Sequence, residues 1–103
     1  MPTISLVYDH NLAPDQVPEV AEKALHRILV GEFGASDLTV EKDLSGDVIF
    51  EFTLGGTFIT GKIKIYDSYF DMVLKVPLLV AFYKSKIIQE LDKYIPKYFG
   101  EQK

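Results

Sequence analysis

The feature that most constrains the fold is an alternation of apolar and polar residues that continues through residues 37–76. Apolar residues at every second position indicate strands with one buried face, and short breaks rich in Gly, Asp and Ser indicate tight turns. Such breaks fall at residues 43–46, 55–56 and 67–68. We therefore predict four consecutive strands joined as an antiparallel meander. Their inward rows are Leu38 and Val40, then Val48, Phe50, Phe52 and Leu54, then Ile59, Gly61, Ile63 and Ile65, and finally Phe70, Met72, Leu74 and Val76.

The opposite side of these strands is mostly polar. Its residues are Thr39, Glu41, Ile49, Glu51, Thr53, Thr60, Lys62, Lys64, Asp71 and Lys75, with Phe58, Tyr66 and Tyr69 among them. A sheet with one apolar and one polar face is usually covered by helices on the apolar face and exposed to water on the other. We expect helices over the inward rows only.

The segments on either side of the meander complete the predicted fold. Residues 3–8 alternate in the same way and predict one more strand, added at an edge of the sheet that the pattern does not specify. Residues 15–30 carry apolar side chains at helical spacing, with glycines at positions 31 and 34 marking the end of the helix. A second helix is expected from about Leu78. The prediction is a single α+β domain over residues 1–103, in the order β-α-β-β-β-β-α, with an antiparallel meander sheet and both helices packed on one face.

The last helix holds more apolar residues than one buried face requires. Pro77 suits the first turn of a helix, so the strand should change to a helix at this point. At about 100° per residue, one stripe collects Val80, Ile87, Ile88, Leu91, Tyr94, Ile95 and Tyr98. Leu78, Leu79 and Phe82 fall outside this stripe. They either tuck under the sheet edge or against the first helix, or form an exposed apolar patch that binds a partner. Pro96 is expected to bend or restart the helix and to carry Tyr98 and Phe99 toward the body.

Composition excludes several classes of protein. The net charge is -4 and the chain lacks a concentrated basic surface, which argues against nucleic-acid binding. There is no Cys for a disulfide scaffold or a thiolate site. Residues 1–11 lack the pattern of a signal peptide, and no apolar run reaches the roughly 18 to 20 residues of a membrane span. We expect a cytoplasmic protein without a membrane span.

Residues that could perform catalysis or bind a metal are present but scattered. His26 faces outward among charged residues of the first helix, and Asp43, Asp47, Asp67 and Asp71 border turns, where aspartate is common. Gly55-Gly56 precedes a strand, so it does not resemble a phosphate-binding loop. His10 follows the first strand, where it could shape the turn or, with Asp9, act in a hydrolase. The favoured interpretation is that the protein is not an enzyme and needs neither metal nor cofactor.

Three segments carry a family resemblance: residues 4–12, the Gly-Lys-Ile-Lys-Ile strand that leads to Asp67, and the run Val-Pro-Leu-Leu-Val-Ala-Phe-Tyr-Lys-Ser-Lys-Ile from Val76. In this order they resemble the bacterial family of polyhydroxyalkanoic acid system proteins, in which the last strand runs into a Leu-Pro-x-Leu segment and a Lys-Ile helix. Val76 stands where Leu is commoner in that family. The resemblance implies a non-enzymatic role in storage-polyester metabolism, at the granule surface, and brings no catalytic residues with it.

Two functional hypotheses follow. In the first, an accessory protein binds a polyester granule surface, a protein partner or a second copy of itself through Leu78, Leu79 and Phe82. In the second, a pocket between sheet and helices binds a fatty acyl chain or a hydroxyalkanoate. Its lining would be Phe50, Phe52, Ile63, Phe70 and Met72, although a filled core explains the same residues in a short chain.

Overall fold

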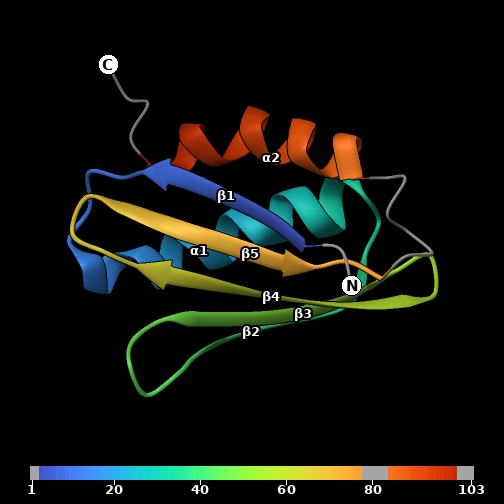
Figure 1. Cartoon of the computed structure of the whole chain (residues 1–103), viewed down its shortest axis with the longest axis horizontal. Coiled ribbons are helices and arrows are strands. Elements are labelled where there is room, and N and C mark those ends of the chain that lie inside the picture. Colours follow the sequence, from blue (N-terminus) through green and yellow to red (C-terminus); the bar gives the residue numbers. More distant parts are fainter. Residues whose placement is uncertain (1–2, 78–83, 100–103) are drawn as a thin grey trace.

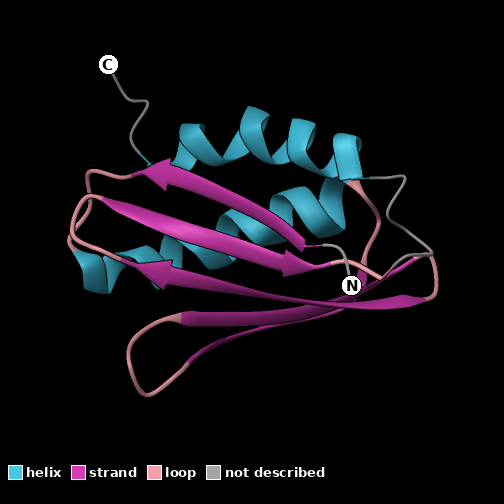
Figure 2. Cartoon of the chain, in the orientation of Figure 1, coloured by secondary structure: helices cyan, strands magenta, loops and turns pink. Residues whose placement is uncertain are grey.

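The computed structural model describes residues 3–77 and 84–99 and has the predicted order of elements. Its elements are β1 (Thr3–Asp9), the short 3-10 helix η1 (Pro14–Gln16), α1 (Val17–Leu25), the π-helical segment η2 (His26–Glu32), β2 (Ser36–Lys42), β3 (Val48–Leu54), β4 (Thr57–Ile65), β5 (Tyr69–Lys75) and α2 (Lys84–Phe99). Figures 1 and 2 show the sheet with its two helices. The α+β class and the order β-α-β-β-β-β-α are therefore confirmed.

All neighbouring strands of the sheet are antiparallel, in the order β1-β5-β4-β3-β2. β1 pairs with β5, which settles the position that the sequence left open. The register sets Ile63 opposite Met72 and Tyr8 opposite Phe70, so the inward rows of adjacent strands meet on one face. β1 and β5, which are far apart in the sequence, are therefore neighbours at one edge of the sheet.

The core fills the space between the sheet and the helices. α1 and η2 contribute Val17, Ala21, Ala24, Leu25, Ile28 and Leu29, and α2 contributes Ile87, Leu91, Ile95 and Phe99. The rings of Phe70 and Phe99 meet edge to face with centroids 4.8 Å apart, a favoured aromatic arrangement. Burying such side chains contributes about 1.5–3 kcal/mol each.

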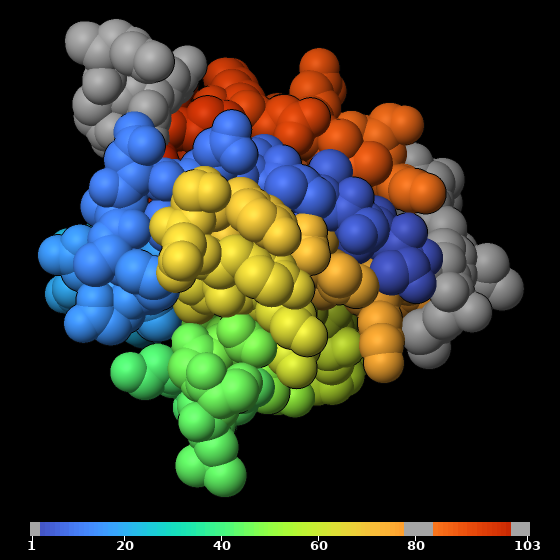
Figure 3. Space-filling model, turned by 60° about the vertical axis from the view of Figure 1, so that its left-hand side comes forward, coloured from blue at the N-terminus to red at the C-terminus, as the bar shows by residue number. Residues whose placement is uncertain are grey.

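The turns of the meander follow from their residues. Gly55 and Gly56 have φ values of 59° and 79°, as the two central residues of a type I′ hairpin turn require. The turn between β2 and β3 projects from the body (Figure 3). There the Asp43 side chain accepts hydrogen bonds from the Ser45 amide, the Ser45 hydroxyl and the Asp47 amide. Asp47 Oδ1 in turn accepts the amide of Ile65 at 2.9 Å, which fastens the turn to β4.

Helix α2 is described from Lys84, so the predicted start near Leu78 and the stripe residue Val80 lie outside the described residues. The helix continues through Pro96 to Phe99 and does not restart at the proline. Tyr8 attaches it to β1 by donating a hydrogen bond of 2.7 Å to Asp92 Oδ1. Burial raises the pKa of Tyr8, and the hydrogen bond to the carboxylate raises this pKa further. Within residues 3–77 and 84–99, no helix is long and apolar enough to cross a membrane.

Candidate functional site

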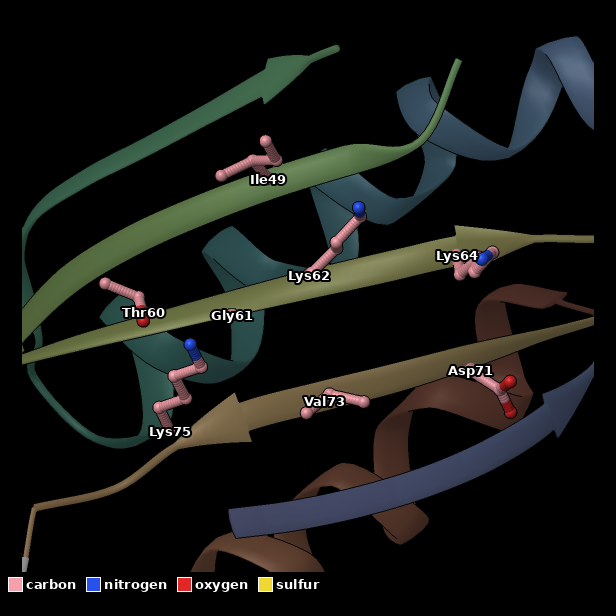
Figure 4. Close-up of a pocket in the computed structure, with 8 residues that line it drawn as sticks. All are labelled: Ile49, Thr60, Gly61, Lys62, Lys64, Asp71, Val73 and Lys75. Carbon is pink, nitrogen blue, oxygen red and sulfur yellow. The ribbon is translucent and has the colours of Figure 1, made fainter. Parts of the chain in front are cut away.

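The candidate site is a hollow on the sheet face that the helices leave uncovered. Figure 4 looks onto this face, with both helices behind the strands. The hollow measures about 440 Å³ and opens over the three middle strands, β3, β4 and β5. It is lined by Ile49, Thr60, Gly61, Lys62, Lys64, Asp71, Val73 and Lys75. Its volume falls within the range of small-ligand sites, about 300–1,000 Å³.

Strand register brings these side chains together. Thr60 lies opposite Lys75, and Lys62 lies opposite Val73 on one side and Ile49 on the other. These positions alternate with the buried inward rows, so their side chains point away from the core. Directly opposed residues have Cβ atoms about 4.5–5.5 Å apart, and diagonal neighbours are about 7–8 Å apart. Residues far apart in sequence therefore share one surface.

Positive charge predominates in the hollow, although the chain as a whole carries a net charge of -4. Three lysines line it against the single carboxylate of Asp71. Lys62 Nζ lies 3.9 Å from Asp43 Oδ2, at the outer limit for an ion pair. Lys64 lies directly opposite Asp71, whereas Lys75 lies between Thr3 and Thr60. Among the described residues, neither Lys64 nor Lys75 forms an ion pair. The hollow can therefore attract an anion.

The hollow also has an apolar floor. Val73 and Ile49 flank Lys62 in one row across the three strands, and 40% of Ile49 is exposed. Accessible apolar side chains near Lys75, which has no carboxylate directly opposite it, favour a ligand that has both an anionic group and an apolar part. The polar side chains of the lining are three ammonium groups, one hydroxyl and one carboxylate. These groups can bind an anionic ligand.

His10 lies away from the hollow and has a structural role. It is only 3% exposed. The Leu12 amide donates to His10 Nδ1 at 3.2 Å, so the ring proton is on Nε2, which donates to the Tyr66 carbonyl oxygen at 2.8 Å. Nε2 thus joins the end of β1 to the β4–β5 turn, and Nδ1 holds the turn that follows β1, which agrees with the turn interpretation. His26 is exposed on the helical side, as expected. The described residues hold no group of three His, Asp or Glu side chains that could bind a metal ion.

The two sets of residues chosen from the sequence have different positions. The proposed pocket lining of Phe50, Phe52, Ile63, Phe70 and Met72 lies in the core, and each of these side chains is 0% exposed. A ligand between sheet and helices would have to separate them. Leu78, Leu79 and Phe82 lie outside the described residues.

Six of the eight lining residues were expected on the exposed face but were not grouped, whereas Gly61 was assigned to the inward row and Val73 was not named on either face. A signal was present: Ile49 and Val73 are aliphatic residues on a mostly polar face, and Lys62 and Lys64 repeat on one side of a strand. What the pattern lacked was the register that sets them side by side.

Comparisons with known proteins add little. No family model matches the chain, and no curated protein matches it. A solved structure, that of TTHA0849 from Thermus thermophilus, is similar over 94% of this chain and 91% of that chain, with 9% sequence identity and a TM-score of 0.36. A likeness at this level supports no argument about function.

Proposed function

We propose that the chain is a non-enzymatic accessory protein of polyhydroxyalkanoate metabolism, which acts in the cytoplasm by binding, with the open-face hollow as its binding site. The observation that carries the binding role is the combination of three lysines, of which Lys75 has no carboxylate directly opposite it, with an apolar floor on an uncovered sheet face. The polyester setting comes from the resemblance of residues 4–12, 61–67 and 76–87 to the family named above.

Leu78, Leu79 and Phe82 form a second proposed binding surface, for a granule or for another protein, including a second copy of the chain. Full burial of an apolar side chain of this size contributes about 1.5–3 kcal/mol before the costs of association. Three such residues would support weak binding. Binding through these three residues should depend on apolar contact and should therefore be insensitive to salt.

The test is co-sedimentation with purified polyhydroxybutyrate granules stripped of protein, with polystyrene particles of the same size as the control for unspecific adsorption. The wild-type protein should sediment with granules and remain in solution with polystyrene. The double variant Lys62→Gln/Lys75→Gln tests the hollow, and Leu79→Ser/Phe82→Ser tests the second surface. Lys23→Gln, on the exposed side of α1, is the matched charge control.

The results separate the possibilities. Loss of sedimentation in the lysine double variant alone supports the hollow, and loss in the Leu79/Phe82 double variant alone supports the second surface. Each variant is first checked by circular dichroism, because a misfolded protein would also lose binding. A wild-type protein that fails to sediment with granules, or that sediments equally with polystyrene, contradicts the polyester role.

A further inference from the structure

We infer that the open-face hollow is a site for an aliphatic monoanion, with the charged head held by Lys75, Lys62 and Thr60 and the aliphatic chain lying over Val73 and Ile49. The inference deepens the proposed binding role and rests on it. It commits to one chemical class of ligand and to one orientation in the hollow.

The position of the head follows from charge. Lys75 has only Thr60 and Thr3 as its cross-strand partners, so no carboxylate lies directly opposite it. Lys62 follows Thr60 by two residues on the same face of β4 and is therefore a diagonal neighbour of Lys75. Figure 4 shows Lys75 extending from β5 toward Thr60 and Gly61. The Lys75 ammonium and the Thr60 hydroxyl can thus reach a single anionic group, and Lys62, which extends toward β3 in Figure 4, joins them by turning from Asp43 toward Lys75.

A carboxylate lies near each end of the hollow: Glu51 is opposite Thr60, and Asp71 is opposite Lys64. Lys64 lies directly opposite Asp71, whose carboxylate would repel the head and offset the attraction of the lysine. Lys62 is also partly neutralised by Asp43, because its Nζ lies 3.9 Å from Asp43 Oδ2. Lys75 is therefore the principal cation of the hollow.

The floor determines the rest of the ligand. Val73, the stem of Lys62 and Ile49 form one row across β5, β4 and β3, which is two interstrand spacings or about 9–10 Å long. An inorganic anion would occupy the head position and leave this row in water. An aliphatic chain covers the row, and each methylene removed from water strengthens binding by up to about fourfold.

The experiment is a titration of ¹⁵N-labelled protein with decanoate below its micellar concentration, followed by amide chemical shifts. Acetate and inorganic phosphate test the head without the chain, and decanol tests the chain without the charge. We expect decanoate to shift the amides of Thr60, Gly61 and Val73 and to bind at least about tenfold more tightly than acetate or phosphate. Added salt should weaken decanoate binding, because the head site is exposed to solvent.

Three variants test the orientation. Lys75→Gln should weaken decanoate binding about fivefold, the upper range for an exposed charge pair. Val73→Thr keeps the shape and the strand preference but makes the floor polar, so it should weaken decanoate binding by up to about fourfold and leave acetate binding unchanged. Lys23→Gln, on the helical side, should leave decanoate binding unchanged.

Any of three results would overturn the inference: acetate or phosphate binding as tightly as decanoate, Lys75→Gln behaving like Lys23→Gln, or shifts centred on Phe50 and Phe70, which would place the chain in the core. The granule experiment is independent of this one. Decanoate bound in the hollow without granule sedimentation refutes the polyester setting and leaves the ligand class standing. Granule sedimentation without decanoate binding refutes the ligand class and leaves the polyester setting standing.

Discussion

Gly61 allows the core to close over the middle of the sheet, because any larger residue there meets an aromatic ring. It lies opposite Phe50 in the β3–β4 pair. A Cβ atom on Gly61 would lie 2.2 Å from Cζ of Phe50, and 2.6 and 2.7 Å from its Cε atoms. Carbon atoms in contact are about 3.5–4.0 Å apart, so the ring would have to retreat by more than about 1 Å. Phe50 is 0% exposed and packs beside Phe52, which leaves little room for that movement.

The substitution Gly61→Ala should therefore destabilise the protein, although alanine is ordinarily preferred to glycine in a strand. Overpacking of a core costs about 1–3 kcal/mol, and the size of the overlap places this case at the upper end. Alanine recovers about 0.5–1 kcal/mol of backbone entropy. The net loss in the free energy of unfolding should be about 2 kcal/mol. At about 4–8 °C per kcal/mol, the midpoint of thermal unfolding should fall by about 8–16 °C.

The assay is urea unfolding followed by far-ultraviolet circular dichroism, since the chain has no Trp to report on folding. A double-mutant cycle with Phe50→Leu identifies the cause, because leucine lacks the ring atoms that overlap. In that background Gly61→Ala should be neutral or stabilise by about 0.5 kcal/mol, a coupling of about 2 kcal/mol. Gly31→Ala is the matched control: its nearest neighbour would be Arg27 Cδ at 3.8 Å, so it should stabilise by about 0.5–1 kcal/mol. An equal loss in both Phe50 backgrounds would refute the steric explanation.

Three further predictions concern polar groups. Tyr8→Phe should destabilise by about 1.5–3 kcal/mol, the contribution of a hydrogen bond to a charged group. Because the folded-state pKa of Tyr8 is raised, its stabilisation should be complete below the ordinary tyrosine pKa and fall as pH rises above it, which unfolding from neutral to alkaline pH in both proteins would reveal. The hydrogen bond from the Ser45 hydroxyl is the main cause of the lowered pKa of Asp43. NMR titration should therefore find a higher Asp43 pKa in Ser45→Ala than in the wild type. In the wild type, the stabilising effect of the Asp43 carboxylate should be lost as pH falls through its lowered pKa. His10→Ala should cost about 1–2 kcal/mol by leaving two partly buried backbone groups without their His10 partner, and a change in ester hydrolysis in this variant would contradict the structural role.

Local patterns in the sequence were sufficient to predict the elements and the faces that they bury. The period of two over residues 37–76 assigns each residue to one side of a strand wherever it pairs, because successive side chains point to opposite faces. Gly55-Gly56 similarly determines its turn by backbone preference alone. The fold class, the helical cover and the buried row that includes Phe50 and Phe70 could therefore be deduced without coordinates.

Other features depend on contacts between distant residues, for which no local pattern is informative. β1 joins the sheet at β5 because its apolar side chains complete the face that α2 covers, with Tyr8 reaching Asp92 across 84 positions of sequence. His10 finds the Tyr66 carbonyl across 56 positions. The candidate site is of the same kind, because the alternation places Lys62, Val73 and Lys75 on the outer face but only strand register sets them around one hollow. Periodicity encodes the direction of a side chain, whereas its neighbours across a sheet are decided by how the whole chain packs.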